Sequence, residues 1–352
     1  MPQSDFARFY RALKREEPDR VPLAELHVDR EVKEAFLGHP ILSVKDEIDF
    51  WHEAGYDYVP LSCGLREEEV ILGGTGGKSI VHSFYEGGRE VGWAEEGEGI
   101  ISNEEDFEAY PWDKLRWFDS ATLEEASRYL PEGMKIIVYS GRIFSRVWMM
   151  MGFRNFCYAL RDNPSLVARM FEINGQIGYE GFERAIEFEK VGGIWVRDDI
   201  AYAEALMISP EWYRRFLFPW YKEIGRVCKE RDLLFIYHSD GNLREVMEDI
   251  IDMGFDAIHP VEPKAMDIRE LKREFGDRLS FIGNIDLGYT LTLGTPQEVE
   301  NEVKERIRDV APGGGYCVGS SNSVTYYVPM ENYEAMRRAT LQYGKYPLKN
   351  LT

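Results

Sequence analysis

The feature that most restricts the fold of this chain is a regular alternation of short apolar runs with longer amphipathic segments. The fifth run, residues 233–237, is apolar without alternation, as expected of a strand covered on both faces. The runs lie at residues 21–28, 58–62, 135–140, 193–197, 233–237, 256–261, 279–283 and 315–319. Eight strands alternating with helices favour a closed (β/α)8 barrel, the TIM barrel, over an open doubly wound sheet.

Residues 66–104 interrupt this alternation. Pairs of glycines there separate short strand-like runs, residues 79–85 and 90–94, so we expect a β-hairpin insertion after the second strand. The chain has 352 residues, of which 44% are hydrophobic, and this length suits one α/β barrel. We therefore expect residues 1–352 to form a single domain.

Composition argues against several classes of partner. A formal net charge of -20 makes nucleic acid and anionic membranes unfavourable partners, because both bind positive surfaces. The sequence has no apolar run long enough to cross a bilayer, and its N-terminus lacks the apolar stretch of a secretory signal. Four scattered cysteines are typical of a reducing compartment. We expect a cytoplasmic enzyme that acts on a small molecule.

Polar residues gather where the predicted strands end. His238 and Asp240 follow the fifth strand, and their side chains would point the same way if the extended geometry persists. In a barrel the C-terminal ends of all strands converge on one mouth, where active sites lie. The polar residues at these ends are Glu25, His27, Ser62, Ser140, Arg142, Asp198, Asp199, His238, Asp240, His259, Glu262, Asn284, Asp286, Ser321 and Asn322. This pattern predicts an active site at the C-terminal mouth.

Three of these residues form a candidate metal site. One imidazole and two carboxylates, those of His238, Asp240 and Glu262, could hold zinc or another divalent ion and leave positions open for water or substrate. A structural alternative is that His238 ends the strand and Asp240 caps the next helix, since aspartate is common at that position. For His259, which precedes Pro260, packing at the strand end is the alternative to a role in the site.

Candidate catalytic carboxylates are Asp198, Asp199 and Asp240. Asp198 and Asp199 are adjacent, so only one of them should face the lumen while the other caps the following segment. The alternative is that both are solvated loop residues. Candidate substrate-binding residues are Glu25, His27, Arg197, Asn284 and Asn322. The guanidinium groups of Arg142, Arg146 and Arg197 could bind a carboxylate or form surface ion pairs.

Several longer motifs resemble one enzyme superfamily. They are Tyr-His-Ser-Asp-Gly-Asn-Leu at 237–243, His-Pro-Val-Glu-Pro at 259–263, Phe-Ile-Gly-Asn-Ile-Asp at 281–286, Gly-Thr-Pro-Gln-Glu-Val at 294–299 and Val-Pro-Met-Glu-Asn at 328–332. As a set they resemble the uroporphyrinogen decarboxylase superfamily, which comprises the haem-pathway decarboxylase and cobalamin-dependent methyltransferases. The resemblance implies a (β/α)8 barrel and a homodimer.

Departures from the motifs separate the two branches. The decarboxylase carries an Arg-Gln-Ala-Gly-Arg type of signature at its first strand, which binds the carboxylates of the porphyrinogen. Residues 23–30 here read Leu-Ala-Glu-Leu-His-Val-Asp-Arg, acidic where that signature is basic. The catalytic aspartate of the decarboxylase also has no match in residues 58–65. A polyanion would be left uncompensated in such a cavity, which disfavours authentic uroporphyrinogen decarboxylation.

The thiol-activating methyltransferases hold zinc through a His-x-Cys motif and a later cysteine. By resemblance His238 takes the first position and Asp240 replaces the cysteine, while the later cysteine falls near Ser321 or Asn322. Cys317 lies within the last strand, off that position. A His and Asp site is harder and less thiophilic, which argues against a thiol acceptor and leaves a demethylase-type reaction open.

Three hypotheses follow. The first is a methyltransferase that moves a methyl group between a small methylated compound and the corrinoid of a partner protein, assisted by His238, Asp240 and Glu262 through a metal or an acid. The second is a decarboxylase of a porphyrinogen or a smaller carboxylic acid that needs no cofactor and uses Asp198 or Asp240. The third is a binding or scaffold barrel without chemistry, because fold alone does not fix function.

Overall fold

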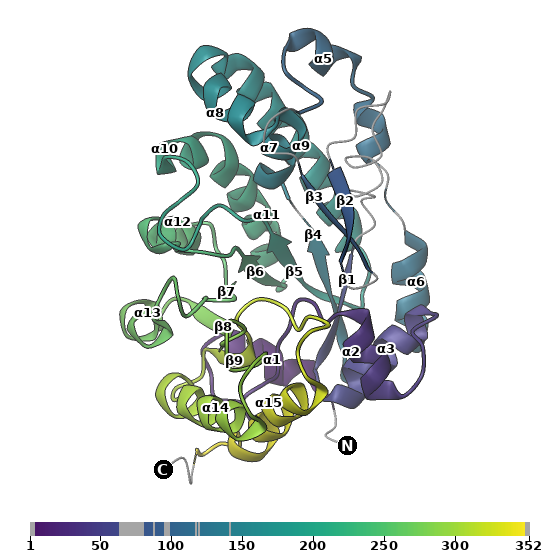
Figure 1. Cartoon of the computed structure of the whole chain (residues 1–352), viewed down its shortest axis with the longest axis vertical. Coiled ribbons are helices and arrows are strands. Elements are labelled where there is room, and N and C mark those ends of the chain that lie inside the picture. The colour runs from purple at the N-terminus through teal and green to yellow at the C-terminus, as the bar shows by residue number, and fades with distance from the viewer. Residues whose placement is uncertain are drawn as a thin grey trace.

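The computed structural model describes residues 4–62, 81–86, 89–94, 99–116, 118, 120–140 and 142–348. Its centre is a seven-stranded parallel sheet in the order β1-β4-β5-β6-β7-β8-β9, which curls with helices around it (Figure 1). The strands are β1 (Tyr58–Ser62), β4 (Lys135–Ser140), β5 (Val191–Arg197), β6 (Leu234–His238), β7 (Ala257–His259), β8 (Ser280–Ile285) and β9 (Tyr316–Ser320). This arrangement is consistent with the predicted TIM-barrel class.

Helices alternate with these strands. They are α1 (Phe6–Leu13), α2 (Arg30–Leu37), α3 (Val44–Ala54), α5 (Glu104–Ala109), η1 (Trp112–Arg116), α6 (Ser120–Tyr129), α7 (Phe144–Met151), α8 (Phe153–Asp162), α9 (Pro164–Ala185), α10 (Pro210–Trp212), η2 (Tyr213–Leu217), α11 (Phe218–Glu230), η3 (Arg244–Val246), α12 (Met247–Asp252), α13 (Ile268–Phe275), α14 (Pro296–Val310) and α15 (Met330–Tyr343). No helix among the described residues combines the length and apolar content needed to cross a bilayer.

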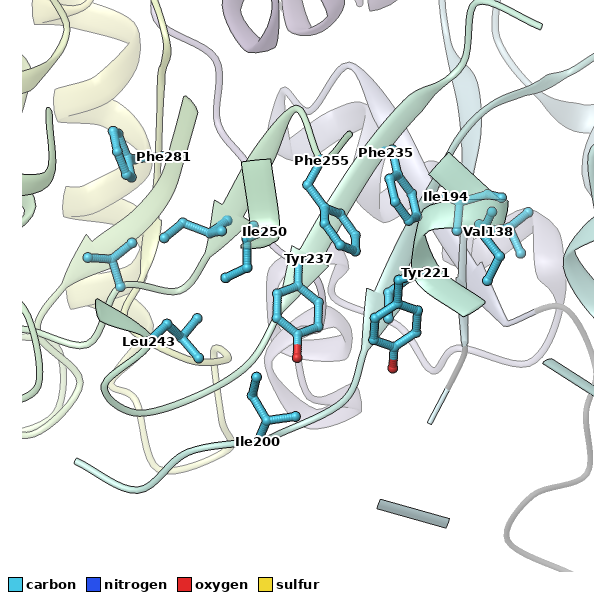
Figure 2. Close-up of a cluster of buried hydrophobic side chains, with 14 of the residues drawn as sticks. Val138, Ile194, Ile200, Tyr221, Phe235, Tyr237, Leu243, Ile250, Phe255 and Phe281 are labelled. Carbon is cyan, nitrogen blue, oxygen red and sulfur yellow. The ribbon is translucent and has the colours of Figure 1, made fainter. Parts of the chain in front are cut away.

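Both faces of the sheet are buried. Residues on the inner face join one apolar cluster, which includes Trp195, Leu234 and Ile236 together with Phe9 and Leu13 of α1. On the outer face, side chains of alternate strand positions pack against the helices, as Figure 2 shows for the larger cluster. Its labelled members are Val138, Ile194, Ile200, Tyr221, Phe235, Tyr237, Leu243, Ile250, Phe255 and Phe281.

This alternation fixes the direction of the first residue of the candidate site. Tyr237 belongs to the outer cluster and Ile236 to the inner one. Because side chains of a strand alternate between its faces, His238 at the end of β6 points inward, as Ile236 does.

The prediction of a first strand at residues 21–28 is wrong. This segment makes only isolated parallel bridges, of Leu23 with Val318 and of Val28 with Val324. Towards β1, its backbone bonds the Tyr58 hydroxyl, which accepts from the amide of Glu25 at 2.9 Å and donates to its carbonyl at 2.7 Å. Pro22 has no amide hydrogen to donate. On the side that faces β1, the backbone bonds the Tyr58 side chain instead of the backbone of a strand, so no continuous ladder of hydrogen bonds forms.

Part of the predicted hairpin insertion lies outside the described residues. The two strands β2 (Val81–Glu86) and β3 (Arg89–Ala94) pair antiparallel with each other. Residues 63–80, 87–88 and 95–98 are not described, so an insertion spanning residues 66–104 stays a prediction.

Candidate active site

Three ligand-type side chains meet at the C-terminal ends of β5 and β6. The Nε2 atom of His238 lies 3.6 Å from Oδ1 of Asp199 and 3.9 Å from Oδ1 of Asp240. One nitrogen and two carboxylate oxygens from these residues all lie within 4.8 Å of one another. The His238 side chain is 7% exposed and that of Asp199 is 49% exposed. The group therefore runs from the buried end of β6 towards solvent.

Asp240 is held in place by two hydrogen bonds. Its backbone amide donates to Oδ1 of Asp199 at 2.9 Å, and Nδ2 of Asn322 donates to its Oδ2 atom at 2.7 Å. Its Oδ1 atom is buried, and no described residue donates a hydrogen bond to it. A buried carboxylate oxygen without a donor is unfavourable unless a proton or a ligand occupies it.

The alternative role of Asp240 as a helix cap is wrong. The next helical turn, η3, begins at Arg244 after Leu243, which provides no side-chain cap. The Asp240 carboxylate instead bonds Asn322 on the far side of the mouth.

The surroundings of Asp240 and His238 determine the protonation state of each side chain. Burial raises the pKa of Asp240 to about 8, and the negative charges of Asp199 and Glu262 act in the same direction. Burial lowers the pKa of His238 to about 4; the charge of Asp199 opposes this shift, whereas Arg197 and Arg142 add to it. At neutral pH without an ion, Asp240 therefore carries a proton and His238 is a neutral imidazole.

A second histidine lies directly behind His238. The Nδ1 atoms of His238 and His259 are 2.7 Å apart, and both residues are buried. Because two lone pairs would repel, one Nδ1 must donate and the other accept. The His259 ring also meets the Trp195 ring edge-on, with centroids 5.1 Å apart, and no described residue bonds its Nε2 atom. His259 is thus packed at the strand end, and it also touches the site.

Two pockets open beside this group. The first, which we name the arginine pocket, has a volume of about 450 Å³ and is lined by Arg142, Trp148, Arg197, Asp199 and Tyr202, among others. The second, the Tyr327 pocket, has a volume of about 400 Å³ and is lined by Asp286, Ser321, Asn322 and Tyr327, among others. Asp240, Glu262 and Lys264 line both pockets. These three side chains therefore form the wall between the two pockets.

Glu262 lies in this wall but outside the close group. Its Oε2 atom accepts from the amide of Gly241 at 2.8 Å, and its Oε1 atom lies 3.1 Å from Nζ of Lys264. The structure thus brings Asp199 to His238 and Asp240, where the sequence interpretation has Glu262. A ligand role for Glu262 stays a prediction.

The adjacent aspartates have different surroundings. The carboxylate of Asp198 is buried and accepts from the amides of Phe144 and Ser145 at 2.7 and 2.8 Å and from the hydroxyls of Ser145 and Tyr221 at 2.6 and 2.5 Å. These contacts place Asp198 at the start of α7, where it satisfies amides that have no partner within the helix. Asp199 lines the arginine pocket.

Two predicted substrate-binding residues of the N-terminal segment do not line either pocket. Glu25 is fully buried, and its two oxygens accept from the amide and hydroxyl of Ser320 at 2.5 and 2.8 Å. Burial raises the pKa of Glu25 to about 8. His27 is exposed, with Nε2 3.1 Å from Oδ1 of Asp29. The structure thus joins Glu25 to the end of β9 and leaves His27 at the surface.

Asn284 has a supporting position. Its Nδ2 atom donates to the carbonyl of Val261, and its Oδ1 atom accepts from Nε of Arg306 at 2.7 Å. Val261 has a φ of 53°, which is costly for a β-branched residue. Asn284 therefore helps to hold the strained turn that carries Glu262. Of the five predicted substrate-binding residues, Arg197 lines the arginine pocket and Asn322 lines the Tyr327 pocket.

Several site residues are absent from the predicted set. They include Lys264, which follows Glu262 in the same loop, and Met207 in the loop after β5. They also include Trp148, which was not predicted because α7 carries no cap signal of its own. The contact of His259 with His238 required the register of β6 and β7, in which the two residues are direct partners.

A parallel, helix-covered sheet with an imidazole and carboxylate group at its C-terminal mouth defines a TIM-barrel-like protein with an enzyme type of site. Residues 103–343 match the family model described as uroporphyrinogen decarboxylase (URO-D), and the chain belongs to this family. The resemblance predicted from the motifs is thereby confirmed, including the methyltransferases within the superfamily.

Relatives include enzymes of both branches. The chain is 27% identical over 137 residues to the methylcobamide:CoM methyltransferase MtaA of Methanosarcina barkeri, a match that covers 39% of this chain and 38% of that protein. It is 24% identical over 255 residues to uroporphyrinogen decarboxylase of Dechloromonas aromatica, covering 67% of this chain and 66% of that protein. The matched regions thus span less than two thirds of these relatives.

A solved structure supports the fold. A methyltransferase from Methanosarcina mazei superposes with a TM-score of 0.73 at 18% sequence identity, and the match covers 96% of this chain and 98% of that chain. At this identity the similarity concerns the fold alone.

Proposed function

We propose that this protein is a methyltransferase of the URO-D family that moves a methyl group between a small methylated compound and the corrinoid of a partner protein. The observation that carries the proposal is the group of Asp199, His238 and Asp240 between two pockets, with one buried carboxylate oxygen to which no residue of the described part of the chain donates. Two pockets that share a wall suit a reaction in which two substrates meet. The methyltransferase relatives support the same branch.

The donor set fits a divalent ion of the zinc class. One neutral imidazole nitrogen and two carboxylate oxygens supply three protein ligands and leave a position open, as in catalytic zinc sites. The unbonded Oδ1 atom of Asp240 is the oxygen that such an ion would engage. When bound, the ion would act as a Lewis acid on the heteroatom that carries or accepts the methyl group. Two oxygens and one nitrogen make a harder set than one with cysteine.

The chain's own residues also suit methyl transfer. When a methyl group leaves a heteroatom, the bonding electron pair stays on that atom, while the acceptor forms the new bond with its own pair. The heteroatom then needs a proton. Since the pKa of Asp240 is raised to about 8, its carboxyl group holds a proton at neutral pH in the absence of an ion and can donate it. Asn322 and the Asp240 amide contact fix the orientation of this group.

A decarboxylase is the second candidate. The protonated Asp240 could deliver a proton to an electron-rich carbon after loss of carbon dioxide, and a uroporphyrinogen decarboxylase matches over the longer stretch of this chain. However, the three cations of the arginine pocket, Arg142, Arg197 and Lys264, already face two carboxylates, Asp199 and Glu262, beside the protonated Asp240. A porphyrinogen with many carboxylates would lack partners there, so a smaller acid is the better substrate for this candidate.

We further propose that residues 1–352 act as one barrel domain and as a homodimer, as the family resemblance implies. Purified protein incubated with methylcobalamin and a methyl acceptor, and separately with uroporphyrinogen, tests the function. We expect demethylation of the corrinoid, seen as a change in its visible spectrum, and no conversion of uroporphyrinogen. Asp240→Asn should lower the rate at least 100-fold, because it removes both a ligand and an acid.

Asp277→Asn is the matched control. It makes the same carboxylate-to-amide change at a side chain that is 80% exposed. Conversion of uroporphyrinogen without corrinoid demethylation would replace the proposal with the second candidate, and two negative results would favour a scaffold barrel.

A further inference from the structure

The arginine pocket has a different charge distribution from its neighbour. Besides the shared Lys264, its positive residues are Arg142 and Arg197. In the Tyr327 pocket, the charged residue outside the shared wall is the negative Asp286. The two arginines also line this pocket together with Asp199 and Asp240, so their charges lie next to the reaction centre. An anionic group is therefore favoured in the arginine pocket and disfavoured in the Tyr327 pocket.

The two guanidinium groups come from different elements. Arg197 ends β5, and its guanidinium carbon lies 5.4 Å from the centroid of the Tyr139 ring, a contact that limits its motion. Arg142 precedes α7 and is half-buried, and no carboxylate of the described residues forms an ion pair with it. A third arginine of the same region, Arg146, is buried within α7 and bonds Asn174 at 3.5 Å instead. Arg142 and Arg197 are thus the pair that a ligand can reach.

The remaining wall of the pocket restricts the ligand's size and charge. Trp148, Met149 and Met207 provide apolar surface, and a volume of about 450 Å³ suits a small molecule. The forked, planar guanidinium group matches a carboxylate with two parallel hydrogen bonds. A dianion such as phosphate would lie close to the carboxylates of Asp199 and Glu262, so a single negative charge is favoured.

We propose that the arginine pocket binds the carboxylate group of the small-molecule substrate through Arg142 and Arg197. The substrate is then a short carboxylic acid whose apolar chain lies along Trp148 and Met149 and whose methyl-bearing atom points to Asp240. The position of the methyl-bearing atom rests on the proposed function, whereas the binding of the carboxylate by the two arginines does not depend on it.

Direct binding tests the inference without any turnover. Isothermal titration with 3-methoxypropionate and its neutral analogue 3-methoxypropanamide compares a carboxylate with an amide of nearly equal shape. We expect the acid to bind at least tenfold more tightly than the amide, and Arg142→Gln and Arg197→Gln each to weaken its binding about tenfold or more, because each removes a charged hydrogen-bond donor. Arg142→Lys keeps the charge without the fork and should lose less than Arg142→Gln.

Arg338→Gln, at a side chain that is 72% exposed on α15, is the control and should bind as the wild type does. Equal affinity for acid and amide, no saturable binding of either, or unchanged affinity in folded Arg142→Gln and Arg197→Gln would overturn the inference. Arginine-dependent binding without methyl transfer would refute the proposed function alone, whereas methyl transfer that is indifferent to both arginines would refute the carboxylate site alone.

Discussion

At the scale of single residues, the central feature is a carboxyl group that keeps its proton to unusually high pH. Burial beside Asp199 and Glu262 raises the pKa of Asp240 to about 8. In an unfolded chain the pKa of an aspartate is about 3.9. Between these two values the folded protein binds a proton that the unfolded chain has lost, so the stability that Asp240 contributes decreases as the pH rises through this window.

A pH series tests this protonation. In metal-free protein, Asp240→Asn keeps a neutral side chain of the same size at every pH and should remove the penalty. We expect the variant to be more stable than the wild type at pH 8 to 9, by on the order of 1–2 kcal/mol after screening by solvent, and the difference to vanish near pH 4. Chemical denaturation in the presence of a chelator measures it. A difference that is independent of pH would show that Asp240 ionises normally.

The tautomer of His238 depends on its hydrogen bond with His259. If His238 donates from Nδ1 to Nδ1 of His259, its Nε2 lone pair faces Asp199 and Asp240 and can bind an ion. We expect His259→Phe, which cannot accept this bond, to weaken zinc binding about 10- to 100-fold, and His259→Asn, whose side-chain oxygen can accept it, to weaken binding less. Competition with a zinc chelator measures the affinity. Equal losses in the two variants would mean that His259 acts through packing alone.

At the scale of elements, the site depends on the start of α7. Ile143, the residue before this helix, provides no side-chain cap, and the role passes to Asp198, which accepts from the amides of Phe144 and Ser145. The helix and the residues just before it bring Arg142, Ser145, Trp148 and Met149 to the arginine pocket. A carboxylate at the end of β5 thus positions one wall of the pocket.

Removing this carboxylate should affect stability and the pocket together. Asp198→Ala leaves two amides and two hydroxyls without their buried acceptor, so we expect a loss of about 2–4 kcal/mol in the free energy of unfolding. Asp198→Asn keeps one acceptor oxygen and should lose less. Urea denaturation gives the values. A loss below about 0.5 kcal/mol for Asp198→Ala would show that α7 is positioned without it.

The same helix shows where prediction from sequence ends. Local signals are sufficient for α14, where Thr295 and Glu298 form a capping box, and for the seven strands of the sheet. The start of α7 could not be predicted, because its cap comes from a residue 54 positions away. The pattern of residues 21–28 is typical of a strand. On one side, however, the backbone of this segment bonds the Tyr58 hydroxyl and not the backbone of another strand, which the sequence pattern does not reveal.

The candidate site was predictable to a similar degree. The curl of the parallel sheet brings Asp240, Glu262 and Asn322 to one mouth beside His238, since strand ends converge there in this fold. The replacement of Glu262 by Asp199 in the close group could not be foreseen, because it depends on one backbone hydrogen bond from Asp240. Loop conformation, unlike strand order, leaves no periodic signal in the sequence.

At the scale of the whole molecule, three exposed tyrosines lie at or next to the two pockets. Tyr202 lines the arginine pocket and Tyr327 lines its neighbour, and the rings of Tyr326 and Tyr327 meet with centroids 5.3 Å apart. Tyr202, Tyr326 and Tyr327 are 55%, 47% and 52% exposed. Exposed aromatic side chains at the entrance to a site are typical of surfaces that bind a partner.

These tyrosines allow a test of the proposed corrinoid protein partner. We expect Tyr326→Ala to raise KM about tenfold for a corrinoid bound to its carrier protein, because truncation removes apolar contact area, and to leave the rate with free methylcobalamin unchanged. Tyr129→Ala, at a 49% exposed tyrosine that lines neither pocket, is the control. An equal effect of Tyr326→Ala on free and protein-bound corrinoid would contradict docking at these tyrosines.

The most direct test of the reaction centre is the metal content of the purified protein after loading with zinc and removal of the excess, measured by elemental analysis for the wild type and for His238→Ala and Asp240→Ala. Three ligands that converge within 4.8 Å predict about one ion per chain in the wild type and well under half an ion in each variant. An ion content that is the same in all three proteins, or a wild type that retains no ion, would contradict the assignment of Asp199, His238 and Asp240 as a metal site.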